Sequence, residues 1–139
     1  MTGLLKNYAA TAHFPYVPEW TNHIGVQYEF PAFDFGRLLL RGDYSYQSTK
    51  YFFTTDLPTQ NPFNDLIKSP DQNLVSARLT LTDVPVWNGK ATMEASLWGE
   101  NLLNSQYLIQ AVDFGPALGF ATKTYGMPRT FGFDLKLKY

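Results

Sequence analysis

Apolar and polar residues alternate along five runs of this chain, and this alternation limits its possible folds more than any other feature. The runs cover residues 22–30, 36–48, 74–82, 91–101 and 130–139. A period of two places successive side chains on opposite faces of a strand, whereas helical periodicity is nearly absent. The pattern predicts an all-β chain, an antiparallel up-and-down meander of about five to six long strands. The end of the sixth strand is expected within residues 1–12. In the last run the apolar positions are Phe131, Phe133, Leu135, Leu137 and Tyr139.

The predicted strands and their connections favour a membrane barrel over a soluble sandwich. Strands of globular proteins are mostly about five or six residues long, whereas a strand that crosses a bilayer at about 45° needs roughly 9 to 11 residues. The connections also alternate in length, because 31–35 and 83–90 are short while 52–73 and 101–128 are long. Asn88-Gly89 is a turn signal in the second short connection. Short turns on one side and long loops on the other are typical of outer-membrane barrels.

Aromatic residues make up 17% of the chain and gather near the ends of the predicted strands. Two aromatic girdles around an aliphatic band are expected where a barrel meets the two membrane interfaces, although aromatic residues favour strands in general. If the short turns are periplasmic, the inner girdle is Tyr28, Phe30, Phe33, Phe35, Trp87 and Tyr139. The outer girdle is then Tyr44, Tyr46, Tyr51, Phe52 and Phe53. The aliphatic band between them is Leu38, Leu40, Leu79, Met93, Ala95 and Leu135.

Composition and charge exclude several classes of protein. The chain has 11 Lys and Arg against 12 Asp and Glu, so it lacks the basic excess of a nucleic-acid-binding surface. It has no cysteine, which excludes disulfides and thiolate metal sites. No apolar run approaches the roughly 18 residues of a transmembrane helix, and the first residues lack the pattern of a signal peptide. If the protein acts outside the cytoplasm, we expect its export signal to lie upstream.

The polar residues predict no catalytic site, metal site or cofactor. Glu94 and Glu100 lie six residues apart on one strand face, a separation of about 20 Å that is too long for a glycosidase pair. His13 and His23 lack the spacing of metal ligands, and no serine lies in a nucleophile elbow. The 52–73 loop is rich in oxygen donors but lacks EF-hand spacing, which favours a solvated loop. Its donors are Asp56, Asn61, Asn64, Asp65 and Asp71.

Charges of both signs occur on the polar faces of the predicted strands, which predicts pairing across strands rather than a selective anion pore. The basic members are Arg37, Arg41, Arg78, Lys136 and Lys138. The acidic members are Glu29, Asp43, Glu94, Glu100 and Asp134.

Two segments, GENLLNSQY (99–107) and MPRTFGFDLKLKY (127–139), resemble the C-terminal end of TonB-dependent outer-membrane receptors. In that family the penultimate strand closes on a short Asn-Leu signature and a Tyr, and a long outer loop leads to Pro-Arg and a final strand with an aromatic end. VPEWTNHIGVQYEF (17–30) and LRGDYSYQSTKYF (40–52) are similar to other strands of that barrel. The matching residues are Asn101, Leu102, Asn104, Tyr107, Pro128, Arg129 and Tyr139, whereas the family's usual last residue is Phe. We expect Asn101 and Asn104 to satisfy backbone groups at a strand end rather than to act in catalysis.

The resemblance implies a 22-stranded transmembrane barrel with an N-terminal plug domain and a segment that engages TonB. Five strands are too few to close a bacterial membrane barrel, and an open sheet in lipid would leave unpaired edges. We therefore expect residues 1–139 to be the C-terminal fragment of such a barrel, lacking the plug and the remaining strands. The implied function is TonB-energised uptake of a large nutrient such as a ferric siderophore, cobalamin or an oligosaccharide, at the outer membrane of a Gram-negative bacterium.

The resemblance also implies partners and site residues. The partners are outer-membrane lipid, the missing plug and strands, TonB through the absent N-terminal region, and the barrel-assembly machinery. That machinery would read the last strand, through Phe131, Phe133, Leu135, Leu137 and Tyr139. Four aromatics of the last long loop either contact the ligand or pack against one another, namely Tyr107, Phe114, Phe120 and Tyr125. Two alternatives stay open: a small outer-membrane barrel of the porin or adhesin kind, which several chains could form, and a soluble β-barrel or sandwich that binds a ligand.

Overall fold

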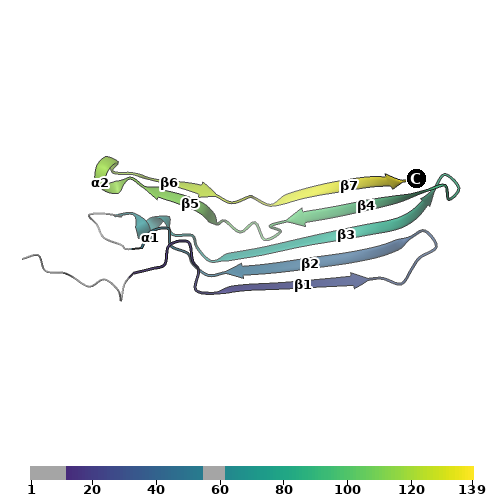
Figure 1. Cartoon of the computed structure of the whole chain (residues 1–139), viewed down its shortest axis with the longest axis horizontal. Coiled ribbons are helices and arrows are strands. Elements are labelled where there is room, and N and C mark those ends of the chain that lie inside the picture. Colours follow the sequence, from purple (N-terminus) through teal and green to yellow (C-terminus); the bar gives the residue numbers. More distant parts are fainter. Residues whose placement is uncertain (1–11, 55–61) are drawn as a thin grey trace, which may run out of the picture. The chain divides into compact units, whose positions relative to one another are not determined.

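A computed structural model of the chain describes residues 12–54 and 62–139 (Figure 1). The chain divides into two compact units. We call the first the long sheet, which comprises residues 22–46, 73–105 and 127–139. The second is the hairpin unit, whose described residues are 12–21, 47–54, 62–72 and 106–126.

The long sheet consists of strands that follow one another as an antiparallel meander. They are β1 (Thr21–Glu29), β2 (Arg37–Gln47), β3 (Gln72–Val86), β4 (Ala91–Glu100) and β7 (Thr130–Lys138). Their order is β1-β2-β3-β4-β7, so β4 and β7 are neighbours although β5 and β6 lie between them in the sequence (Figure 1). The all-β class and the five predicted long strands are confirmed. The largest difference is at β3, which runs to Val86 and occupies the first half of the predicted turn 83–90.

A bulge in β3 explains its length. The pairing of β3 with β4 shifts between Leu81 and Val84, and Asp83 has a left-handed backbone with φ of 58°. An extra residue in one strand reverses the faces to which all later residues of that strand point. Leu81 and Val84 therefore face the same side, opposite Ala95 and Met93. The bulge keeps the apolar residues of β3 on one face of the sheet, although the alternation of apolar and polar residues shifts by one position between Leu81 and Val84.

The short connections are tight, left-handed turns. Between β3 and β4, Trp87, Asn88 and Gly89 have φ values of 51°, 57° and 80°, which confirms the Asn-Gly turn signal. Gly89 N donates to Val86 O at 3.1 Å. Between β1 and β2, Gly36 has a φ of 139°, and its amide exchanges backbone hydrogen bonds with Phe33 at 3.1 and 2.9 Å.

The hairpin unit carries the only sizeable apolar core among the described residues. It contains α1 (Asn64–Ile67), β5 (Leu108–Asp113), α2 (Gly115–Leu118) and β6 (Ala121–Tyr125), with β5 and β6 paired as a two-stranded sheet. The core is formed by Phe52, Ile67, Leu108 and Ala111, with Phe53, Phe63 and Ala121 packed against it. The segment 101–128, predicted as a long loop, therefore contains a hairpin.

Burial of Phe52 corrects the predicted outer girdle. Only 3% of Phe52 is exposed, and Phe53 packs against the same core. Phe52 is thus buried in the core of the hairpin unit and Phe53 is packed against it, so neither ring belongs to an interfacial girdle. The predicted sixth strand at residues 1–12 falls almost wholly outside the described residues, as do Asp56 and Asn61 of the 52–73 loop. Among the described residues, neither helix has the length and apolar character needed to cross a membrane.

Candidate functional site

The long sheet has one apolar face, and its side chains are largely uncovered. Because side chains alternate along a strand, the cross-strand partners in β3, β4 and β7 assign each residue to a face. The exposed fraction is 66% for Val26, 60% for Leu97 and 65% for Phe133. We call this surface the apolar face. Its members are Ile24, Val26, Tyr28, Leu38, Leu40, Leu79, Leu81, Val84, Val86, Met93, Ala95, Leu97, Phe131, Phe133, Leu135 and Leu137.

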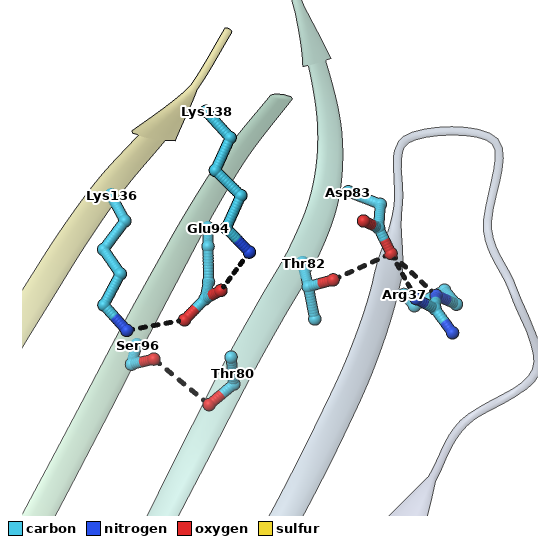
Figure 2. A network of polar contacts seen from close by, with 8 residues as sticks. All are labelled: Arg37, Thr80, Thr82, Asp83, Glu94, Ser96, Lys136 and Lys138. Carbon is cyan, nitrogen blue, oxygen red and sulfur yellow. Dashed lines mark hydrogen bonds and ion pairs between the residues drawn. The ribbon is translucent and has the colours of Figure 1, made fainter. Parts of the chain in front are cut away.

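The opposite surface, the polar face, holds charges that neutralise one another. Glu94 of β4 accepts hydrogen bonds from Lys136 Nζ at 3.1 Å and from Lys138 Nζ at 3.2 Å, both of them on β7 (Figure 2). Next to it, the hydroxyls of Thr80 on β3 and Ser96 on β4 are 3.1 Å apart. The carboxylate is thus held between two ammonium groups of the neighbouring strand, which confirms the predicted pairing across strands.

A second cluster of ion pairs lies at the bulge of β3. Arg37 of β2 contacts Asp83 with Nη2 at 2.6 Å from Oδ2, and its Nη1 lies 3.3 Å from Glu29 Oε1. Thr82 Oγ1 donates to Asp83 Oδ2 at 2.8 Å (Figure 2). The sequence pattern places Asp83 in a turn, so it does not predict this pair. The alternation breaks between Leu81 and Val84, which are three positions apart, and this break is the sequence signal that could have revealed the bulge and its ion pair.

The remaining charges of the polar face surround Trp98. Arg78 Nη1 lies 2.8 Å from Asp134 Oδ2, and the Arg78 guanidinium carbon is 5.9 Å from the centre of the Trp98 ring. Arg41 and Asp43 also form an ion pair, at 2.8 Å, but along one strand rather than across two.

A shallow cavity of about 130 Å³ opens between the Arg41 and Trp98 side chains. Among the described residues, no group of three or more His, Asp or Glu side chains could hold a metal ion. Glu94 is engaged by two lysines, and Glu100 lines the cavity. The ion pairs neutralise charge along the polar face of the sheet. The described side chains bring together no acid, base and nucleophile that could act in catalysis.

The Asn-Leu signature connects the end of β4 to the start of β7. Asn101 is only 7% exposed, and its amide nitrogen donates to the carbonyls of Ser105 and Met127, each at 3.0 Å. Its Oδ1 accepts from Ser105 N at 2.8 Å. Asn104 Oδ1 accepts from Arg129 N at 3.4 Å. These amides satisfy backbone groups at the point where the chain leaves the sheet and where it returns.

The structure brings together two of the four loop aromatics. Phe114 and Phe120 have ring centres 5.2 Å apart, and Phe114 N donates to Phe120 O at 3.0 Å. The Tyr107 ring lies against Gly126 instead, and Tyr125 is 58% exposed. Phe114 and Phe120 thus pack against each other, which was one of the two expectations for this loop.

One lysine of the hairpin unit has a perturbed pKa. Lys68 Nζ donates a hydrogen bond to Asp65 Oδ1 at 2.5 Å, and this bond raises the pKa of Lys68 above its ordinary value. The same ammonium lies 5.6 Å from the centre of the Tyr51 ring.

Comparison of the chain with protein-family models, with curated proteins and with solved structures finds no match.

Proposed function

We propose that this chain is the C-terminal part of the barrel wall of a TonB-dependent outer-membrane receptor, with its apolar face against lipid. The observation that carries the proposal is the uncovered apolar face of the long sheet. Soluble monomers rarely expose contiguous apolar patches larger than a few hundred Å². Exposing such a face to water costs free energy. Lipid hydrocarbon removes this cost, because it solvates aliphatic and aromatic side chains as well as a protein core does.

The polar face supports the same orientation. Its carboxylates Glu94, Asp83 and Asp134 each have a cationic partner within the sheet. A surface whose charges are paired in this way is suited to the water-filled or plugged interior of a barrel. The side chains therefore separate into a face for lipid and a face for water on the two sides of one sheet.

Strand direction supports a larger barrel over a ring of identical copies. The edge strands β1 and β7 run in the same direction (Figure 1). Copies inserted with one orientation would therefore meet β7 to β1 as a parallel pair, whereas bacterial outer-membrane barrels are antiparallel. An antiparallel closure needs an odd number of further strands between these two edges, as a 22-stranded barrel would supply.

The role follows from the resemblance to these receptors. The long sheet would provide barrel wall, the hairpin unit would belong to the outer loops, and β7 would carry the assembly signal that ends at Tyr139. Uptake of a ferric siderophore, cobalamin or an oligosaccharide would take its energy from the inner membrane through TonB acting on a plug.

Fractionation of cells that make the protein tests the proposal. We expect it in the outer-membrane fraction, resistant to extraction by urea at alkaline pH and released by detergent. A monomer that stays in the soluble fraction without detergent would overturn the proposal. Uptake of the three nutrient classes by cells with and without the gene then tests the transport role, and unchanged uptake of all three would remove it.

A further inference from the structure

We infer that the contact between Trp98 and Gly132 selects the register in which β7 pairs with β4. The inference rests on side-chain contacts within the long sheet and does not depend on the proposed function. Trp98 of β4 lies directly opposite Gly132 of β7 on the polar face. A side-chain carbon built on Gly132 would fall inside the Trp98 indole, against Cζ2 and Cε2. The ring therefore occupies the space that any other residue at position 132 would fill.

Arg78 lies over the indole, and Asp134 of β7 holds Arg78 in turn. The Arg78 guanidinium lies over the ring at 5.9 Å from its centre and is itself bound to Asp134 at 2.8 Å. Asp134 is the next residue of β7 on the same face as Gly132. The ring thus lies among side chains of β3 and β7.

Alternation alone does not fix this register. A slip of one residue would turn every side chain of β7 to the wrong face, so the two-faced pattern rejects it. A slip of two residues preserves both faces. In one direction, a two-residue slip would place Glu94 opposite Asp134 instead of Lys136, and the repulsion of like charges opposes that arrangement.

The slip in the other direction replaces almost every contact with a similar one. Glu94 would lie opposite Lys138, to which it is already bound at 3.2 Å. Leu97 would face Leu135 instead of Phe133, so an apolar pair is kept. Gly99 would face Phe133 instead of Phe131, so a phenyl ring could again cover this glycine, as the Phe131 ring does now.

Among the residues that lie opposite one another on β4 and β7, Trp98 and Gly132 are the pair whose contact the slip changes most. In this slip Trp98 would face Asp134, and Gly132 would face Glu100. The indole would then lose the glycine beneath it and meet a residue that has a side chain. Since each residue of a strand spans about 3.4 Å, the contact determines the position of the end of β7 to within about 7 Å.

Pairs of introduced cysteines measure the register, because the natural chain has no cysteine. Leu97→Cys with Phe133→Cys reports the native register, and Leu97→Cys with Leu135→Cys reports the slipped one. The full chain is oxidised in whole-cell extracts, so the readout is independent of the compartment in which the protein resides. We expect Gly132→Ala to shift the ratio of slipped to native cross-link about tenfold, the effect of a packing clash of about 1.4 kcal/mol.

Matched variants separate register from stability. Gly42→Ala has free space around the added carbon, so it should leave the ratio unchanged. A carbon added at Gly99 would lie 2.6 Å from Leu102 Cδ2 and 2.9 Å from Phe131 Cδ1. Each cross-link forms in a register that places a phenylalanine opposite Gly99, Phe131 in the native register and Phe133 in the slipped one. Gly99→Ala should therefore lower the yields of both cross-links but not their ratio.

The decisive comparison repeats Gly132→Ala in a Trp98→Ala background. With the indole removed, the three atoms nearest to the added carbon are gone, so the ratio should no longer respond to Gly132→Ala. A shift of equal size in both backgrounds would overturn the inference, and so would an unchanged ratio when Trp98 is present. If Gly132→Ala leaves no folded protein at all, recovery of the native cross-link in the double variant supports the inference, and no recovery overturns it.

Discussion

Placing one arginine on either face of β1 provides the sharpest test of a lipid-facing sheet. Val26 lies on the apolar face, near the middle of β1, and is 66% exposed. Its neighbour Gln27 is also exposed but lies on the polar face. In water, an exposed substitution such as Val26→Arg changes the free energy of unfolding by about 0.5 kcal/mol or less. In lipid, arginine on the outward face of a barrel costs roughly 2–4 kcal/mol near the bilayer midplane.

The two environments therefore predict different results for the same pair of variants. In lipid, Val26→Arg should reduce the ratio of folded to unfolded protein by roughly 30-fold to 700-fold, since about 1.4 kcal/mol corresponds to a factor of ten. Gln27→Arg should stay within about 0.5 kcal/mol of the natural chain, because its side chain points into water in either case. The two positions are adjacent on one strand and are both exposed, so a difference in stability between the two variants reports the environment of the face on which the arginine lies.

The assay is urea unfolding of the protein in phospholipid vesicles, with the amount recovered from the outer membrane of cells as a second readout. Val26→Arg should unfold at lower urea and accumulate less, whereas Gln27→Arg should match the natural chain. Equal shifts for the two variants, or a Val26→Arg shift within about 0.5 kcal/mol, would refute the assignment of the apolar face to lipid.

Further predictions concern the chain connections, the ion pairs and the loop. Asn101→Ala removes three hydrogen bonds and should lower the free energy of unfolding by about 3 kcal/mol, against about 1 kcal/mol for Asn104→Ala; similar urea midpoints for the two variants would contradict this. Glu94→Gln should cause a small loss of stability that shrinks as salt is added, because its lysine partners are exposed, and a loss independent of salt would argue for a buried pair. Tyr125→Ala should lower nutrient uptake at an unchanged protein level in the outer membrane, and unchanged uptake would remove this exposed ring from the ligand site. Deletion of Tyr139 should reduce the amount assembled in the outer membrane more than shortening the α2 turn does, and equal amounts would make Tyr139 only a girdle residue.

The long strands could be predicted from the sequence because their signal is local. In β7, polar and apolar residues alternate over the whole strand, and the strand begins and ends within one residue of the prediction. The hairpin of β5 and β6 could not be found in this way, since its strands have only six and five residues. Its core needs Phe52, a residue more than fifty positions before Leu108. No short window of sequence contains both residues.

The faces of the candidate site were predictable for the same reason, but its specific contacts were not. Alternation placed Glu94, Lys136 and Lys138 on one face without knowledge of the register. The pair of Arg37 with Asp83 joins residues 46 positions apart and needs a left-handed aspartate inside a strand. Propensities disfavour such a residue there, and the contact becomes visible only when the strands are aligned.

A repeating pattern and a register carry different kinds of information. A pattern with a period of two determines which side chains share a face, but it is unchanged when a strand moves by two residues. The residues that remove this ambiguity must break the repetition. In the long sheet they are the bulge at Asp83, which matches the phase of β3 to β4, and Gly132 beneath Trp98, which matches β7 to β4. If this reasoning holds, exchanging one aliphatic residue of the apolar face for another, as in Leu137→Ile, should leave the cross-link ratio unchanged. A single methyl group on Gly132 should change it.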